Sequence, residues 1–248
     1  MSRAEPLATR GSGEPGLRSA LRAAAFDFYY QSTRLVPANI AWGLVLLLVL
    51  VVSLGGGPLA TLAAAPLLAI PYAGCVRLAA QAVRGRDVVL SDLPRAYRRY
   101  GLVALAIGAG VTVAGALLAS NVVVGAVTGG AIGWGFGTLA VSGLLAIWVA
   151  SFPVWVVLVD PAREDRPIRD RLRLAILLVV AAPGRCTLLA LVLLAILVLS
   201  TIAFAAVLTI SISYAGLVAA RYLLPLADRL EAWLEQRAAG TDGGGRPG

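Results

Sequence analysis

Four long stretches of this chain contain no Asp, Glu, Arg, Lys or His, and most of their residues are apolar. They run from Leu35 to Val76, from Leu102 to Val159, from Leu174 to Gly184 and from Cys186 to Ala220. A transmembrane helix needs about 20 mostly apolar residues, and a charge at its centre costs about 2.5–3.5 kcal/mol. The pattern therefore predicts an all-α, polytopic integral membrane protein.

We expect six transmembrane helices, arranged as three hairpins with short amphipathic helices on the cytoplasmic side. Gly55-Gly56-Gly57-Pro58 and the uncharged segment 125–131 mark the first two turns, because glycine and proline favour turns. The third turn has neither residue and is placed between Ser200 and Leu208. The predicted spans cover residues 35–57, 58–76, 102–124, 132–159, 185–203 and 206–226.

The ends of the chain differ in composition from the membrane domain, which is expected over residues 16–239. Residues 1–15 and 240–248 are rich in glycine, proline and polar side chains. Such segments cannot bury enough apolar surface to fold, so both are predicted to be disordered tails.

The arginines predict the orientation. All 21 basic residues are arginines, and they fall into four groups between or beside the predicted spans. Six spans place every group on one side of the membrane, which the positive-inside rule assigns to the cytoplasm. We therefore expect both termini in the cytoplasm, with arginines facing anionic lipid headgroups.

Two arginine clusters are the expected contact surface for lipid or for a protein partner. They lie in short helices predicted at Leu93–Tyr100 and Pro167–Val180, and a third such helix is predicted at Leu17–Arg34. Alternating arginine and apolar residues suit a helix in the headgroup layer. The cluster residues are Arg95, Arg98, Arg99, Arg169, Arg171 and Arg173.

Aromatic residues gather near the same predicted span ends. Trp and Tyr are enriched where a membrane meets water, so we expect an anchoring belt there. Its predicted members are Tyr29, Tyr30, Tyr97, Tyr100, Trp155 and Tyr222.

Three glycines recur every four residues around the start of the fourth predicted span: Gly129, Gly133 and Gly137. This spacing lets helix backbones approach closely and predicts a helix-packing site. A homodimer seam or a pocket lined by Trp134 and Phe136 is the alternative.

The residues favour no catalytic, cofactor or metal site. The chain has no histidine, two cysteines and no phosphate-binding loop motif. The net charge of +8 could suggest nucleic-acid binding, but no soluble domain combines a basic groove with aromatic residues, so that class is rejected. The acidic residues between the arginines are predicted to serve as helix caps and surface ion-pair partners: Asp87, Asp92, Asp160, Glu164, Asp165 and Asp170.

Polar residues inside the spans leave transport open. Proton-coupled transporters usually carry an Asp, Glu or His within the membrane, and the predicted spans have none of these residues. Asn39, Thr112 and Ser211 could line a pathway for a small neutral solute. The other interpretation is that they bond within their own helix or bridge neighbouring helices.

Several short motifs carry a family resemblance. The first is Phe26-Asp27-Phe28-Tyr29-Tyr30, followed by Arg34, Asn39, Trp42 and Gly57-Pro58. The others are the segment from Asp92 to Tyr100, and Arg173-Leu174-Ala175 ahead of Pro183-Gly184. Over about residues 20–230, the chain resembles the YesL-like family of bacterial integral membrane proteins, a domain of unknown function. The resemblance implies a bacterial plasma membrane and an association with carbohydrate uptake, with no activity to transfer.

We therefore expect a non-catalytic accessory or scaffold component that binds a membrane-protein partner such as a sugar importer. A transporter or facilitator for a small neutral solute is the alternative, and a membrane enzyme is the third.

Overall fold

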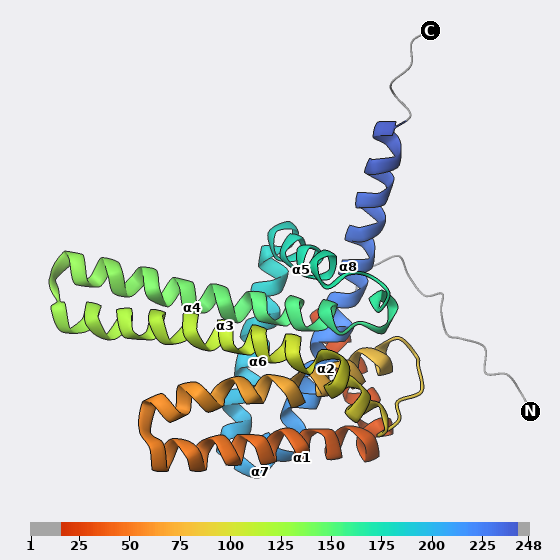
Figure 1. Ribbon diagram of the computed structural model, residues 1–248. Helices are drawn as coiled ribbons and strands as arrows, with labels where there is room; N and C mark the ends of the chain where they lie inside the picture. The colour runs from red at the N-terminus through yellow and green to blue at the C-terminus, as the bar shows by residue number, and fades with distance from the viewer. Residues whose placement is uncertain (1–15, 243–248) are drawn as a thin grey trace, which may run out of the picture.

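The computed structural model describes residues 16–242, and this range is helical apart from short connections (Figure 1). The predicted fold class, an all-α helical bundle, is confirmed. The elements are α1 (Leu17–Ala64), the 3-10 helix η1 (Ala65–Leu68), α2 (Ala69–Val83), α3 (Asp92–Thr128), α4 (Gly130–Leu158), the 3-10 helix η2 (Pro161–Arg163), α5 (Ile168–Ala181), α6 (Pro183–Ile202), the single turn α7 (Phe204–Ala206), the π-helix η3 (Val207–Ser211) and α8 (Ile212–Asp242).

The chain is a multi-pass membrane protein. Within the described residues, five helical segments are long and apolar enough to cross a membrane: 17–83, 92–128, 130–158, 183–202 and 208–237. The first of them turns back on itself at Gly57, so it supplies two legs, which carry the predicted spans 35–57 and 58–76 (Figure 1).

Glycines with positive φ make the two tight hairpin turns. Gly57 has φ +68° and is followed by Pro58, while Gly129 and Gly130 separate α3 from α4 with φ of +62° and +64°. L-residues with a side chain rarely adopt this conformation, whereas glycine adopts it freely. Both turns lie where the glycines predicted them.

The third pair of long helices is arranged differently. The helix breaks at Ala203, inside the range predicted for the third turn, and α7 and η3 then lead into α8. Figure 1 shows α6 and the first part of α8 running steeply across the two hairpins. The Trp148 indole N–H of α4 donates to the Ala190 carbonyl of α6 at 3.1 Å, which fixes this crossing.

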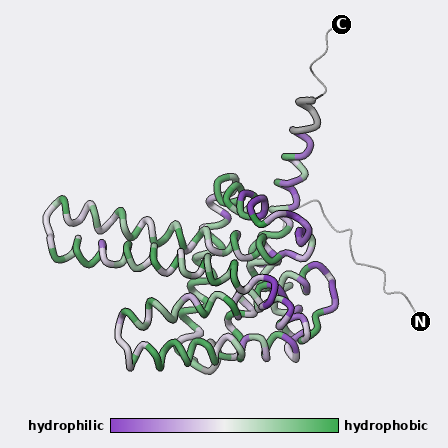
Figure 2. The backbone as a smooth tube through the Cα atoms, viewed as in Figure 1, coloured by the Kyte–Doolittle hydropathy of each residue, from purple (hydrophilic) through white to green (hydrophobic). Residues whose placement is uncertain are grey.

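Helix α8 lies at the centre of the bundle. Leu217, Leu223 and Leu224 are fully buried or nearly so, and α8 packs against α1, α2 and α4. In contrast, the far ends of the two hairpins expose large apolar side chains such as Leu59 in the first and Val127 in the second. Lipid tails rather than water suit such surfaces, and the apolar colouring of both hairpins in Figure 2 follows this division.

Several predicted boundaries differ from the structure. Leu93–Tyr100 is not a separate helix but the beginning of α3, which continues without a break into the span. Leu17–Arg34 is the beginning of α1, but a kink at Gln31, where φ is −112° and ψ is 15°, separates most of it from the span that follows. As predicted, α5 is a separate short helix. The predicted tail at 1–15 lies outside the described residues. The predicted tail at 240–248 begins inside α8, which extends to Asp242, and its remainder also lies outside the described residues.

Candidate functional site

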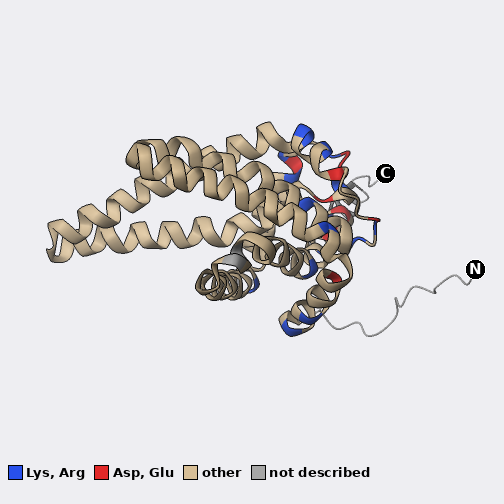
Figure 3. Cartoon of the chain, turned by 90° about the horizontal axis from the view of Figure 1, so that it is seen from below, with Lys and Arg blue, Asp and Glu red and all other residues tan. Residues whose placement is uncertain are grey.

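The charged side chains of the described chain collect at one end of the molecule (Figure 3). We call this the charged end; it comprises residues 17–34, 77–99, 160–173, 185 and 221–237. The lengths of the hairpins beyond it carry no charge. The geometry of the charged end is fixed by side-chain contacts that begin where α4 ends.

Two arginines cap the C-terminus of α4. The Arg77 Nη1 donates to the carbonyl oxygen of Val159 at 2.8 Å, and the Arg171 Nη1 donates to that of Leu158 at 2.7 Å. The last carbonyls of a helix have no partner within the helix and carry partial negative charge. Arg171 also donates to the carbonyl oxygens of Glu164 and Arg166, at 2.8 Å each from Nη2. These bonds hold the chain that leaves α4 against α2 and α5.

Asp160 follows α4 directly and is fully buried. Arg84 donates to both of its carboxylate oxygens, with distances of 3.1 Å from Nε to Oδ1 and 2.7 Å from Nη2 to Oδ2. Arg163 forms an ion pair with Oδ2, and the Ala162 backbone N–H donates to Oδ1 at 3.1 Å. A buried carboxylate is tolerated only when donors replace water in this way.

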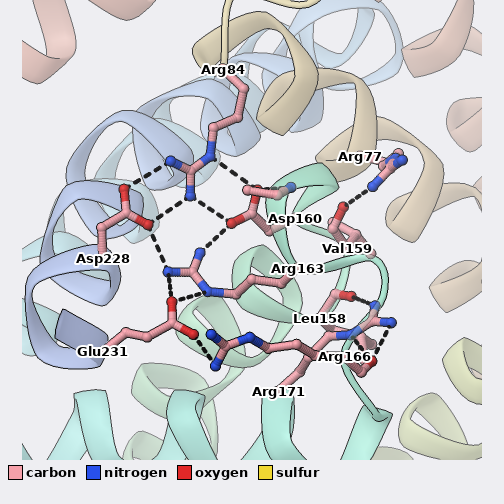
Figure 4. Close-up of polar contacts among 11 residues, drawn as sticks. Arg77, Arg84, Leu158, Val159, Asp160, Arg163, Arg166, Arg171, Asp228 and Glu231 are labelled. Carbon is pink, nitrogen blue, oxygen red and sulfur yellow. Dashed lines mark hydrogen bonds and ion pairs between the residues drawn. The ribbon is translucent and has the colours of Figure 1, made fainter. Parts of the chain in front are cut away.

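The same arginines reach α8 (Figure 4). Arg84 makes two hydrogen bonds of 2.8 Å to the Asp228 carboxylate. Arg163 donates from Nη2 to Asp228 at 2.6 Å and to Glu231 at 2.8 Å, and Arg166 pairs with Glu231. We call Arg84, Asp160, Arg163, Arg166, Asp228 and Glu231 the ion network. Because it joins α2, the segment after α4, and α8, it fixes three distant parts of the sequence at one end.

The six predicted surface arginines differ in their exposure to solvent. Arg98, Arg169 and Arg173 are exposed, and the Arg95 and Arg99 side chains are 78% and 51% exposed. The prediction is wrong for Arg171, which is 4% exposed and turns inward to the carbonyls described above.

Two further surface assignments are corrected. Asp160 is not a surface ion-pair partner but the buried centre of the ion network. In the predicted aromatic belt, Tyr29 and Tyr30 are exposed, whereas Tyr100, Trp155 and Tyr222 are 3–6% exposed and pack inside the protein. These three rings are core side chains rather than membrane anchors.

A polar pocket of about 270 Å³ opens beside the ion network. Three arginine side chains surround the Tyr100 ring, with guanidinium carbons 5.8–6.0 Å from its centroid: Arg77, Arg99 and Arg171. The Tyr100 hydroxyl and the Gln81 Oε1 are buried and make no hydrogen bond. We call this the Tyr100 pocket; its lining is Arg77, Gln81, Asp92, Arg95, Ala96, Arg99, Tyr100 and Glu164.

Glu164 forms ion pairs with two of the arginines that line this pocket. Arg77 Nη2 donates to its carboxylate at 2.8 Å, and Arg99 pairs with it as well. Burial alone would raise the pKa of Glu164, but the Arg77 hydrogen bond and the charges of Arg77, Arg99 and Arg86 outweigh burial. The pKa of Glu164 therefore lies below its ordinary value.

A second cavity lies among the apolar helices. It has a volume of about 520 Å³ and lies between α1, α2, α3, α4, α6 and α8. Tyr72 and Trp155 meet edge to face there with ring centroids 5.4 Å apart, as do Trp148 and Phe152 at 4.8 Å. The predicted pathway residue Thr112 lines this cavity.

The other two predicted pathway residues bond to helices. Asn39 is fully buried, and its Oδ1 accepts the backbone N–H of Ser213 at 2.8 Å, near the start of α8. The Ser213 hydroxyl in turn donates to the Leu35 carbonyl at 3.1 Å. The Ser211 hydroxyl donates to the Ala206 carbonyl at 3.0 Å. Asn39 thus ties α1 to α8, and Ser211 bonds to the turn before it.

The predicted glycine packing site has a partner within the chain. A Cβ on Gly133 would lie 2.5 Å from the Gly125 carbonyl oxygen, so α3 and α4 touch backbone to backbone near their turn. Gly129 makes the turn, and a Cβ on Gly137 would meet nothing within 4 Å. Trp134 and Phe136 are 72% and 63% exposed and do not line a pocket with these glycines.

No group of three or more His, Cys, Asp or Glu residues that could hold a metal ion occurs within residues 16–242. The two cysteines, Cys75 and Cys186, are buried and not joined to each other. Comparison with models of protein families, with curated proteins and with solved structures found no match.

Proposed function

We propose that this chain is a non-catalytic accessory or scaffold protein of the bacterial plasma membrane, with its charged end in the cytoplasm and the exposed arginines of α3 and α5 there as the contact surface for a membrane-protein partner. One observation carries the proposal. Exposed Arg169 and Arg173 stand on α5, which the Arg171 cap ties to the end of α4, and exposed Arg95 and Arg98 stand on α3, which the Arg99–Glu164 ion pair ties to the segment after α4. Preorganised charges of this kind steer and orient a partner at little entropic cost.

The spans supply a second support. Their uncharged stretches contain no Asp, Glu or His that could couple transport to protons, while Asn39 ties α1 to α8 and Ser211 bonds to the turn before α8. The family resemblance suggests a sugar importer as the partner.

Co-purification tests this proposal. The chain is purified in mild detergent from its host after cross-linking, and bound membrane proteins are identified by mass spectrometry. The double variant Arg169→Gln/Arg173→Gln should lose the specific partner. Arg18→Gln/Arg22→Gln, which removes the same charge from the start of α1, should retain it. Equal recovery with both double variants would contradict the proposed surface.

The cavity lined by Thr112 favours a second candidate, a facilitator for a small neutral solute. Its aromatic walls and few hydroxyl groups are typical of sites for uncharged ligands. Purified protein in liposomes separates the two functions. Saturable uptake of a neutral sugar that falls in Thr112→Val would favour the facilitator, whereas the accessory function predicts no uptake above that of empty liposomes.

A further inference from the structure

The Tyr100 pocket has an excess of positive charge. Its lining contains three guanidinium groups and two carboxylates, those of Asp92 and Glu164. Arg95 makes one ion pair, with Asp92 at 3.1 Å, which uses one of its five N–H donors. The pocket therefore retains both charge and donors for an anion.

Two buried polar atoms in the same pocket make no hydrogen bond. The Tyr100 residue is 3% exposed and its hydroxyl has no partner, and the Gln81 Oε1 likewise accepts nothing. Buried polar atoms are nearly always paired in folded proteins, so each of these points to a bound molecule. The hydroxyl can donate to an anionic oxygen, while the amide oxygen needs a donor such as an alcohol or an amine.

The pocket lies where the charged end meets the lipid-facing surface. Tyr100 is two residues before Leu102, which is 84% exposed at the start of the uncharged hairpin. Val89 and Leu90, in the connection that leads to Asp92, also expose apolar side chains. This is the depth at which phospholipid headgroups lie. The volume of about 270 Å³ equals that of roughly nine water molecules, which suits a phosphate with a small polar substituent.

We propose that the Tyr100 pocket binds the phosphate of an anionic phosphoester. Arg95 and Arg99 hold the phosphate oxygens, since a planar guanidinium matches phosphate in two-point contacts. The Tyr100 hydroxyl donates a further hydrogen bond to the phosphate, and the Gln81 Oε1 accepts a hydrogen bond from a hydroxyl group of the same molecule. The place of the pocket at the membrane boundary makes a phosphatidylglycerol headgroup the favoured source, ahead of a soluble phosphoester.

The test uses the full chain in detergent micelles and measures its melting temperature against added ligand. Phosphatidylglycerol is compared with phosphatidylcholine and with glycerol 1-phosphate, which has no acyl chains. Arg95→Gln and Tyr100→Phe each remove one of the proposed contacts. Arg98→Gln is the matched control, because Arg98 is an exposed arginine of the same helix that does not line the pocket.

Phosphatidylglycerol should raise the melting temperature more than phosphatidylcholine does. In Arg95→Gln the concentration for half of the effect should rise about ten-fold or more, and in Tyr100→Phe several-fold, whereas Arg98→Gln should match the wild type. Tyr100→Phe should keep the wild-type melting temperature without lipid, because its hydroxyl has no partner to lose.

Each other outcome has a defined meaning. An equal effect of glycerol 1-phosphate, lost in the same two variants, would support the phosphate site and assign it to a soluble phosphoester. The proposal is overturned if phosphatidylglycerol acts no better than phosphatidylcholine. It is also overturned if Tyr100→Phe responds like the wild type or Arg98→Gln responds like Arg95→Gln.

Discussion

The guanidinium of Arg171 donates a hydrogen bond of 2.7 Å to the carbonyl oxygen of Leu158, so an arginine of α5 closes the C-terminus of α4. The same side chain reaches two carbonyls of the segment between these helices. An arginine that the sequence places among surface charges is therefore a structural part of the charged end.

Arg171→Gln should destabilise the protein, because the shorter neutral side chain leaves the buried Leu158 carbonyl and the part-buried Arg166 carbonyl without the Arg171 donor. The expected loss is about 2–3 kcal/mol of unfolding free energy. Arg173→Gln on the same helix is the control: Arg173 is exposed, and its replacement should change stability by less than about 0.5 kcal/mol. Thermal melting in detergent gives the comparison, and equal melting of both variants would refute the capping role.

Gly133→Ala should destabilise the α3–α4 hairpin, since its Cβ would lie 2.5 Å from the Gly125 carbonyl oxygen. Overpacking of this kind costs about 1–3 kcal/mol, and Gly133→Leu should cost more. Gly135→Ala provides the matched control, because a Cβ there meets nothing within 4 Å. Melting temperatures of the purified variants test the difference, and a Gly133→Ala variant as stable as Gly135→Ala would rule out this close contact.

Glu164 should make stability depend on pH in acid. Its pKa is lower in the folded protein than its ordinary value of 4.5, so its contribution is fully present above about pH 4.5 and is lost as the pH falls through the folded pKa. The difference in melting temperature between wild type and Glu164→Gln should therefore be constant near pH 7 and shrink below pH 4.5. A difference that stays the same down to pH 3 would show that the carboxylate charge is not what stabilises this site.

Asn39→Ala should lower stability by about 1–2 kcal/mol, because the Ser213 N–H near the start of α8 loses its buried acceptor. Thr112→Val should be close to neutral, since Thr112 lines the apolar cavity. A pathway role would instead leave both variants stable and impair solute uptake in both.

The fold followed from the sequence because charge is excluded from lipid, and this rule acts on long segments regardless of their contacts. The turns at Gly57 and Gly129 could be placed for a local reason, because each lies among glycines midway along an uncharged run that is long enough for two spans. In contrast, Arg84 and Asp228 are 144 positions apart, and nothing local pairs them. The ion network was therefore beyond the reach of the sequence pattern.

Two features that the sequence analysis missed, the inward position of Arg171 and the packing role of Gly125, could have been found from the spacing of residues along the chain. Arg171 lies at helical spacing from three buried residues, Leu174, Ala175 and Leu178, so the 3.6-residue period places it on their inner face. The alternation of Arg169, Arg171 and Arg173 was interpreted as one exposed surface. In a helix, however, residues two positions apart do not point in the same direction. Likewise, Gly125 precedes Gly129 by the same four residues that separate Gly129 from Gly133. Gly125 was placed in the predicted turn and for that reason was not counted with the packing glycines.

The orientation of the charged end underlies the proposed function, and single-cysteine labelling tests it most directly. Cysteines are introduced one at a time in a chain in which Cys75 and Cys186 are replaced by alanine, and intact cells are treated with a membrane-impermeant thiol reagent. Gly55 is suitable at the first turn, because a Cβ there meets nothing within 4 Å, and Thr128 at the second. We predict labelling of these two positions in intact cells, and labelling of positions 87, 164 and 240 only after permeabilisation. Labelling of position 240 in intact cells would contradict a cytoplasmic charged end.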